Sequence, residues 1–170
     1  IIYGNAEQLL AKLDNGEIHF ALIEGYFPSH KYEQLLYYTD SFICVCAKNH
    51  TFSQKVNHIE DLLNERILVR ETGSGTRDLL DSYLKTYNLS YLDFKNHLEI
   101  ESISSIISLL KNDCGISFLY RLSVEEELKN GSLKEIKIQN LPLHHDTTFL
   151  WNKNSVYSKQ YKEICKELIG

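Results

Sequence analysis

Apolar and polar positions along the chain switch between a helical and an extended period, and this switching predicts a series of short elements. Residues 5–15 place leucines at helical spacing, with Asn5 as the N-cap, Gln8 at the capping-box position and Gly16 at the end of the helix. Residues 18–24 follow as IHFALIE, which is apolar on both faces. That pattern is typical of an interior strand of a parallel sheet.

The same alternation continues to the end of the chain. Further strands are predicted at 35–47, 66–71, 97–101, 115–120, 133–138 and 147–151, and further helical segments at 58–63, 76–87, 102–111, 123–130 and 158–169. The helix at 123–130 begins with a capping box, SVEE, and ends at Gly131. The last helix is expected to direct four side chains toward the protein core, namely Tyr161, Ile164, Cys165 and Leu168.

Strands that alternate with helices predict an α/β fold with a mostly parallel sheet. Two stretches are candidate hinges. At residues 64–67 a short helix gives way to a new strand–helix series, and residues 140–142 contain one of the two prolines. If the chain crosses from one lobe to another at both hinges, residues 1–65 and 143–170 form the first lobe and residues 66–142 form the second.

Hydrogen-bond donors collect where predicted strands end and helices begin. Residues 72–76, TGSGT, alternate hydroxyl side chains with Gly73 and Gly75, and residues 102–105 open the next helix with serines and no acidic side chain. A helix start presents unpaired N–H groups and the positive end of the helix dipole, and glycine lets a ligand approach the backbone. Because ligands of α/β sheets bind beyond the carboxyl ends of the strands, both turns are candidates to bind a carboxylate or an oxyanion.

Other interpretations of the first turn stay open or are disfavoured by its residues. Ser74 or Thr76 could serve only as a helix N-cap, and Asp78 could satisfy the helix dipole. The turn does not match a phosphate-binding P-loop, because no lysine follows Gly75, and its GSG segment is too short for a dinucleotide-binding motif. Gly73 and Gly75 directly flank Ser74, whereas the glycines of a hydrolase nucleophile elbow are spaced one residue further from the serine. None of the seven histidines has a setting that marks it as a catalytic base.

Glutamates also end three of the predicted strands, at Glu24, Glu71 and Glu101. They could be solvated caps of the sheet. Alternatively, one of them could bind an ammonium group of a ligand, or pair with Arg70 or Arg77 across a cleft. The second interpretation would make a zwitterionic metabolite possible.

Composition narrows the class of protein. Of 170 residues 43% are hydrophobic, which allows a packed core, while a net charge of −5 without a Lys/Arg cluster argues against direct binding of nucleic acid. Cys44, Cys46, Cys114 and Cys165 have no metal-ligand spacing and are predicted to be free thiols in a reducing cytoplasm. No apolar run is long enough to cross a bilayer, and the first residues do not resemble a signal peptide.

Several segments follow one another in an order that matches a known family. They are GN and LxxGEIxxALIEG within residues 4–25, DSFICVCAKNH at 40–50, IxDL at 59–62, RExGSGTR at 70–77, EIESISSI at 99–106 and GISFL at 115–119. In this order they resemble the regulatory domain of LysR-type transcriptional regulators over essentially the whole chain. The RExGSGTR form is most similar to the branch that contains the CysB and CysL sulfur-assimilation regulators.

This resemblance implies a type 2 periplasmic-binding-protein-like fold, in which two Rossmann-like α/β lobes joined by two crossover strands enclose a small effector. The family's earlier strand and helix of the first lobe precede the matched part, so the chain is expected to start at the second strand of that lobe. Together with the strand-end pattern, the resemblance makes candidate effector-binding residues of Glu24, Gly25, Thr72, Gly73, Ser74, Gly75, Thr76, Ser102, Ile103, Ser104 and Phe118. No metal or cofactor is expected.

The resulting hypothesis is the effector-sensing domain of a bacterial regulator, not an enzyme, in which a small anionic metabolite bridges the two donor turns. The resemblance implies a homodimer through this domain, a tetramer of the full-length protein, and contact with DNA only through an N-terminal winged helix-turn-helix outside these residues. Two alternatives share the fold: an extracytoplasmic solute-binding protein of a transporter, and an enzyme such as a prephenate dehydratase or a deaminase.

Overall fold

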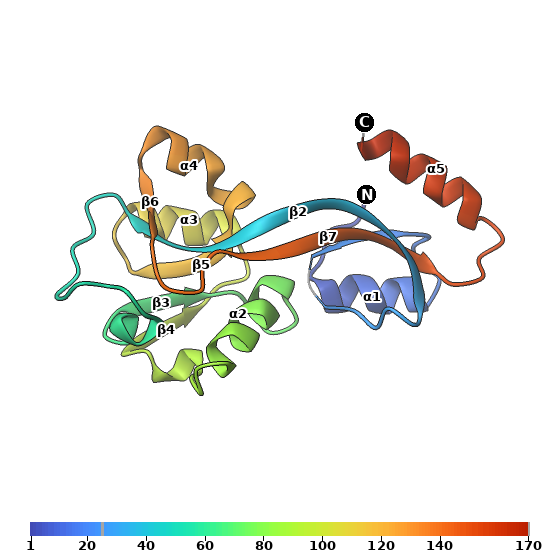
Figure 1. Cartoon of the computed structure of the whole chain (residues 1–170). Coiled ribbons are helices and arrows are strands. Elements are labelled where there is room, and N and C mark those ends of the chain that lie inside the picture. Colours follow the sequence, from blue (N-terminus) through green and yellow to red (C-terminus); the bar gives the residue numbers. More distant parts are fainter. Residues whose placement is uncertain (25, 170) are drawn as a thin grey trace.

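Two long strands connect the two bodies into which the chain folds (Figure 1). The computed structural model describes residues 1–24 and 26–169. Strands β2 (Tyr32–Ala47) and β7 (Leu143–Asn152) pair antiparallel, from Tyr32 opposite Asn152 to Phe42 opposite Leu143, with a shift of register at a bulge between Leu36 and Tyr38. Both strands pass from one body into the other, so they are the two crossover strands that were expected.

The first body contains α1 (Ala6–Asp14), β1 (Ala21–Glu24) and α5 (Ser158–Ile169) beside the outer ends of β2 and β7. Its first helix begins as predicted, because the Asn5 side chain accepts a hydrogen bond from the Gln8 N–H at 2.9 Å and the Gln8 side chain accepts one from the Asn5 N–H at 3.2 Å. Such a reciprocal pair satisfies donors that the helix itself leaves unpaired.

Strand β1 differs from the prediction of an interior parallel strand. It pairs antiparallel with β7 and is the first strand of the sheet order β1-β7-β2-β5-β3-β4, with β6 paired to β2. Leu22 on this strand is 40% exposed. Within the apolar run IHFALIE, Ala21 and Ile23 are buried in the core that Leu13 and Leu150 complete, while Ile18 and Phe20 are only partly buried.

The second body contains most of the remaining elements. These are β3 (Arg66–Val69), β4 (Asn96–Glu99), β5 (Ile116–Tyr120) and β6 (Leu133–Ile136), with α2 (Gly75–Lys85), α3 (Ile103–Lys111), α4 (Glu125–Asn130) and the short turns η1 (Ile59–Leu62), η2 (Tyr91–Asp93) and η3 (Arg121–Val124). Only the pairings of β3 with β4 and with β5 are parallel, and the other described pairings are antiparallel. The prediction of a mostly parallel sheet is therefore wrong, because both crossover strands run against their neighbours.

The core of the second body includes residues that the sequence interpretation placed in the first lobe. Ile59 and Leu62 are buried in the same apolar cluster as Val69 and Leu84. The lobe limits at residues 65 and 143 stay a prediction, and this packing favours a first crossing within β2.

Two helix details also differ from expectation. Ser123 lies inside η3 and does not cap α4, which starts one residue after Val124 without a side-chain cap and ends at Gly131 as predicted. In α5, Tyr161 and Cys165 pack against Phe149 and Trp151, but Leu168 is 57% exposed. The inward position predicted for Leu168 is wrong, because the buried contacts of the helix end at Cys165.

Candidate functional site

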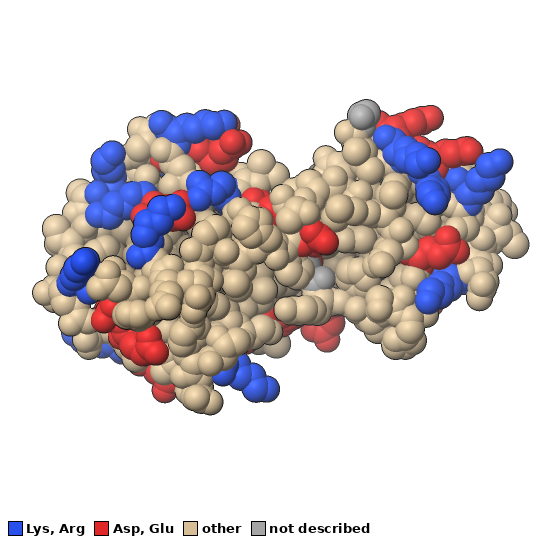
Figure 2. Space-filling view, in the orientation of Figure 1, with Lys and Arg blue, Asp and Glu red and all other residues tan. Residues whose placement is uncertain are grey.

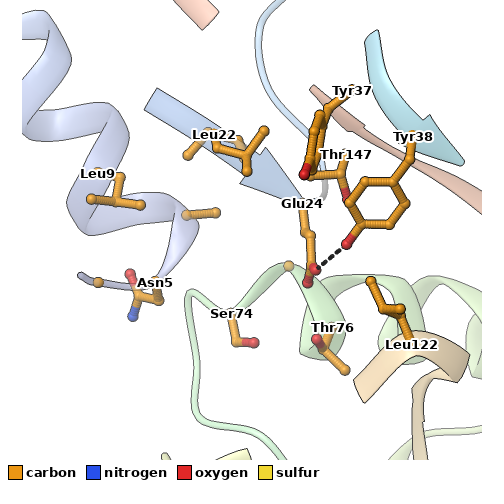
Figure 3. Close-up of a pocket in the computed structure, with 14 residues that line it drawn as sticks. Asn5, Leu9, Leu22, Glu24, Tyr37, Tyr38, Ser74, Thr76, Leu122 and Thr147 are labelled. Carbon is orange, nitrogen blue, oxygen red and sulfur yellow. Dashed lines mark hydrogen bonds between the residues drawn. The ribbon is translucent and has the colours of Figure 1, made fainter. Parts of the chain in front are cut away.

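The first turns of α1 and α2 face one cavity between the two bodies (Figure 3). Its volume is about 300 Å³. The start of α1 and the end of β1 form the side that belongs to the first body, and Ser74, Gly75 and Thr76 form the side that belongs to the second. Side chains from the crossover strands, including Tyr38 and Thr147, lie between these two sides. The cavity therefore collects residues that are far apart in the sequence.

The start of α2 presents the hydroxyl groups of Ser74 and Thr76 to the cavity. Ser74 is the N-cap residue, with φ −79° and ψ 132°, yet its side chain makes no capping hydrogen bond. Ser74 is 3% exposed and Thr76 is 4% exposed, and within residues 1–24 and 26–169 neither hydroxyl makes a hydrogen bond. Their oxygen atoms are accessible from the cavity, because the one fully buried side-chain polar atom without a partner in the described residues is His50 Nε2. Because the first N–H groups of a helix also lack intrahelical acceptors, this turn can bind an anionic group.

Gly73 brings the two bodies into contact beside this turn. Its φ is +87°, a left-handed conformation that favours glycine. Its carbonyl accepts a hydrogen bond from the Glu7 N–H at 3.4 Å, and a Cβ at this position would lie 2.5 Å from Glu7 Oε2. The backbone conformation thus favours glycine, and a larger residue would also displace the Glu7 side chain.

Glu24 ends β1 and directs its carboxylate toward the first turn of α2 (Figure 3). The Tyr38 hydroxyl donates a hydrogen bond to Glu24 Oε1 at 3.5 Å. Burial raises the pKa of Glu24, and the nearby Asp40 carboxylate raises it further, while the Tyr38 hydrogen bond and Arg70 act in the opposite direction. Among the described residues that line the cavity, Glu24 alone has a charged side chain.

The arginines that flank the loop are engaged elsewhere. Arg70 donates to Glu71 through Nε at 2.8 Å and through Nη2 at 3.0 Å. Arg77 is 6% exposed, donates to Asp81 at 2.9 Å and to Glu99 at 3.2 Å, and lies 3.9 Å from the centre of the Tyr91 ring. Neither guanidinium lines the cavity.

The second donor turn lies on the same edge of the sheet but outside the cavity lining. Val69 of β3 pairs in parallel with Glu99 of β4, so the turns that follow these strands are neighbours. Ser102 caps α3, accepting a hydrogen bond from the Ser105 N–H at 3.3 Å, and its Oγ lies 2.8 Å from that of Ser104. Ser102 and Ser104 are exposed.

The structure thus brings together some of the predicted site residues and separates others. Glu24, Ser74, Gly75 and Thr76 line the cavity. The residues outside its lining are Thr72, Gly73, Ser102, Ile103, Ser104 and Phe118, the last of which is 2% exposed in the apolar core. Gly25 lies outside the described residues. The role of each residue in ligand binding stays a prediction.

The sequence interpretation did not predict the other lining residues, among them Asn5, Tyr38, Leu122 and Thr147. Asn5 was assigned only as a helix cap, and Tyr38 and Thr147 belonged to extended runs with no distinguishing mark. Leu122 follows a predicted strand without any polar signal. Only the pairing of β2 with β7 and the approach of the two bodies place them at the cavity.

Comparison with known proteins assigns the chain to a family. Residues 1–168 match the family model of the LysR substrate binding domain. The chain belongs to this family. Probable RuBisCO transcriptional regulators of Gracilaria tenuistipitata var. liui and Chlorokybus atmophyticus are 26% and 28% identical to it, over 91% and 92% of its length. The chain spans about half of each relative, 52% and 51%.

Solved regulatory domains share the fold of this LysR-family chain. The CcmR regulatory domain of Synechocystis PCC6803, in complex with 2-PG, superposes with a TM-score of 0.78 at 19% identity, covering 97% of this chain and 80% of that one. The effector binding domain of QuiR in complex with shikimate has a TM-score of 0.76 at 20% identity, covering 97% and 78%. The chain therefore has the periplasmic-binding-protein-like α/β fold. No helix in the described residues has the length and apolarity needed to span a membrane.

Proposed function

We propose that this chain is the effector-sensing domain of a LysR-type transcriptional regulator, and that a small ligand with an anionic group binds in the cavity between its two bodies. The observation that carries the proposal is the position of Ser74 and Thr76 at the start of α2, where both residues line the cavity and neither hydroxyl makes a hydrogen bond within the described residues. Hydroxyl groups and unpaired helix N–H groups that face a cavity together are suited to bind an anionic group of a ligand.

A ligand in this cavity would act by favouring one arrangement of the two bodies. It would contact α1 and β1 on one side and the first turn of α2 on the other. Because these contacts exist together only when the bodies are close, the ligand stabilises the closed arrangement by its differential affinity. The hydrogen bond from Glu7 to Gly73 belongs to that same arrangement.

The remaining parts of the proposal concern the whole protein. The full-length regulator would bind DNA through an N-terminal helix-turn-helix, form homodimers through this domain and tetramers in full length, and act in the cytoplasm without catalysing a reaction. Solved relatives bound to 2-PG and to shikimate support a small effector. Within the family, the RExGSGTR motif at residues 70–77 supports a place near the CysB and CysL branch, while the curated relatives support a place near the RuBisCO regulators.

Isothermal titration calorimetry on the full-length protein tests the site. The panel would contain small carboxylates, sulfate, sulfite and acetylserine. For a ligand that binds, Ser74→Ala combined with Thr76→Val should weaken affinity at least tenfold, because hydrogen bonds to a charged group contribute about 1.5–3 kcal/mol each.

A second variant separates the two donor turns. Ser102→Ala, at an exposed cap outside the cavity lining, is expected to change the affinity less than twofold. Unchanged affinity in the Ser74→Ala, Thr76→Val variant would show that the ligand binds elsewhere. A large loss in the Ser102→Ala variant would show that the second donor turn contributes to binding.

A further inference from the structure

The charges around the cavity are unusual for a site that binds an anion. The described lining contains no lysine, arginine or histidine, and its one charged side chain is the carboxylate of Glu24. In the view of Figure 2, Lys and Arg gather on the outer parts of the two bodies, while uncharged and acidic residues occupy the surface between them. The cavity thus has polar donors at the start of α2 and a negative charge opposite them.

The two arginines that flank residues 72–76 cannot neutralise a bound anion without breaking existing ion pairs. Arg70 forms a two-nitrogen pair with Glu71, and the two side chains are 14% and 16% exposed. Arg77 is held by Asp81 and Glu99. A ligand with only negative charge would therefore meet Glu24 across a small space whose described lining contains no cationic side chain, and like charges in such a space repel strongly.

A ligand that brings its own positive charge removes this conflict. We propose that the effector is a small zwitterion, an α-amino acid with a neutral apolar side chain, whose carboxylate is bound at the first turn of α2 and whose ammonium group is bound by Glu24. This inference rests on the proposed function and specifies its ligand class.

The other lining residues fit the parts of such a ligand. The Tyr38 hydroxyl, 3.5 Å from Glu24 Oε1, lies on the ammonium side and holds the Glu24 carboxylate. Leu9, Leu22 and Leu122 supply apolar surface for the side chain. A cavity of about 300 Å³ is at the small end of the range for ligand sites, which suits a molecule of amino-acid size.

The protonation of Glu24 agrees with this assignment. Burial holds the pKa of Glu24 above its ordinary value in the free protein, and a bound ammonium group would lower it again. Two contacts would thus be made together, an ion pair at Glu24 and hydrogen bonds at Ser74 and Thr76. A carboxylic acid without the amine could make only the second contact.

Calorimetry with matched pairs of ligands tests the inference on the full-length protein. The pairs are L-valine with 3-methylbutanoate and L-leucine with 4-methylpentanoate, which differ only in the ammonium group. The unmodified protein should bind at least one amino acid ten or more times more tightly than its deaminated partner. Glu24→Gln should weaken binding of that amino acid at least tenfold and strengthen binding of the deaminated acid.

A control variant and a folding check keep the result interpretable. Glu101→Gln changes an exposed carboxylate in the bend between β4 and α3, outside the cavity lining, and should leave both affinities unchanged. Thermal unfolding of Glu24→Gln should show a folded protein, because the change removes a partly buried charge without changing the size of the side chain.

The outcomes separate this inference from the proposed function. If the deaminated acid binds as tightly as the amino acid and is lost in the Ser74→Ala, Thr76→Val variant, the cavity is the effector site but the ammonium assignment is wrong. Unchanged amino-acid affinity in Glu24→Gln also overturns the inference. If no probe binds the unmodified protein, the amino-acid class is rejected, and the panel of anions decides the proposed function by itself.

Discussion

Gly73→Ala tests whether the close approach of the two bodies depends on this glycine. The residue has φ +87°, its carbonyl accepts the Glu7 N–H, and the new Cβ would lie 2.5 Å from Glu7 Oε2 and 3.3 Å from Asn5 Nδ2. The substitution therefore changes the backbone conformation and the contact between the bodies at one position.

The expected magnitude follows from these two effects. A non-glycine residue in the left-handed region costs about 1–2 kcal/mol, and the reduced freedom of the unfolded chain returns about 0.4–1 kcal/mol, which leaves about 1 kcal/mol. Displacing the Glu7 carboxylate adds about 1 kcal/mol, the low end for overpacking, because Glu7 is exposed and its side chain can move. Gly73→Ala should thus lower the free energy of unfolding by about 2 kcal/mol.

Gly16→Ala is the matched control, since Gly16 has φ +71° and a Cβ added there would meet no atom within 4 Å. Gly16→Ala should lower the free energy of unfolding only by the cost of the left-handed backbone conformation, about 1 kcal/mol. Equilibrium urea unfolding measures both variants, and each kcal/mol corresponds to about 2–4 °C in Tm for a chain of this length. Adding Glu7→Ala to Gly73→Ala should recover about 1 kcal/mol in a double-mutant cycle.

Two results would refute this reasoning about Gly73. Equal destabilisation by Gly73→Ala and Gly16→Ala would show that the contact with Glu7 has no energetic role. An unchanged affinity of Gly73→Ala for any ligand that binds the unmodified protein would show that this contact is not part of the ligand-binding arrangement.

Three further predictions concern charge, packing and thiol chemistry. Burial raises the folded-state pKa of Glu24 above its unfolded value of 4.5, so the stability contributed by the protonated group is present below pH 4.5 and is lost as pH rises through the folded pKa. Glu24→Gln should therefore raise the free energy of unfolding at pH 7 but not at pH 4, as measured by urea titration. An equal gain at both pH values would contradict this sign. Ile106→Ala should cost about 3 kcal/mol because Ile106 is 0% exposed, whereas Leu168→Ala, at a side chain 57% exposed, should cost less than about 0.5 kcal/mol by the same measurement. Burial raises the pKa of Cys46 to about 12, so a thiol-specific disulfide reagent should label the partly buried Cys114 first, and early labelling of Cys46 would contradict the described burial.

Interactions between near neighbours were predictable from the sequence. The capping box of Asn5 and Gln8 links residues three apart, and the glycine and hydroxyl pattern at residues 72–76 predicts a donor-rich start of α2. The order of segments was sufficient to predict the family and hence the two-body fold. These features depend on residues within one helical turn or on a pattern along the chain, so each can be predicted without knowledge of the tertiary structure.

The tertiary structure decided which of these features meet. Ala21 pairs with Leu150, more than a hundred residues away, and this pairing makes β1 antiparallel and directs Glu24 toward α2. The same approach of the two bodies brings the first donor turn to the cavity and leaves Ser102 outside its lining. Strand direction and the facing of side chains across a cavity depend on contacts between distant segments, and helical or strand periodicity contains no information about those contacts.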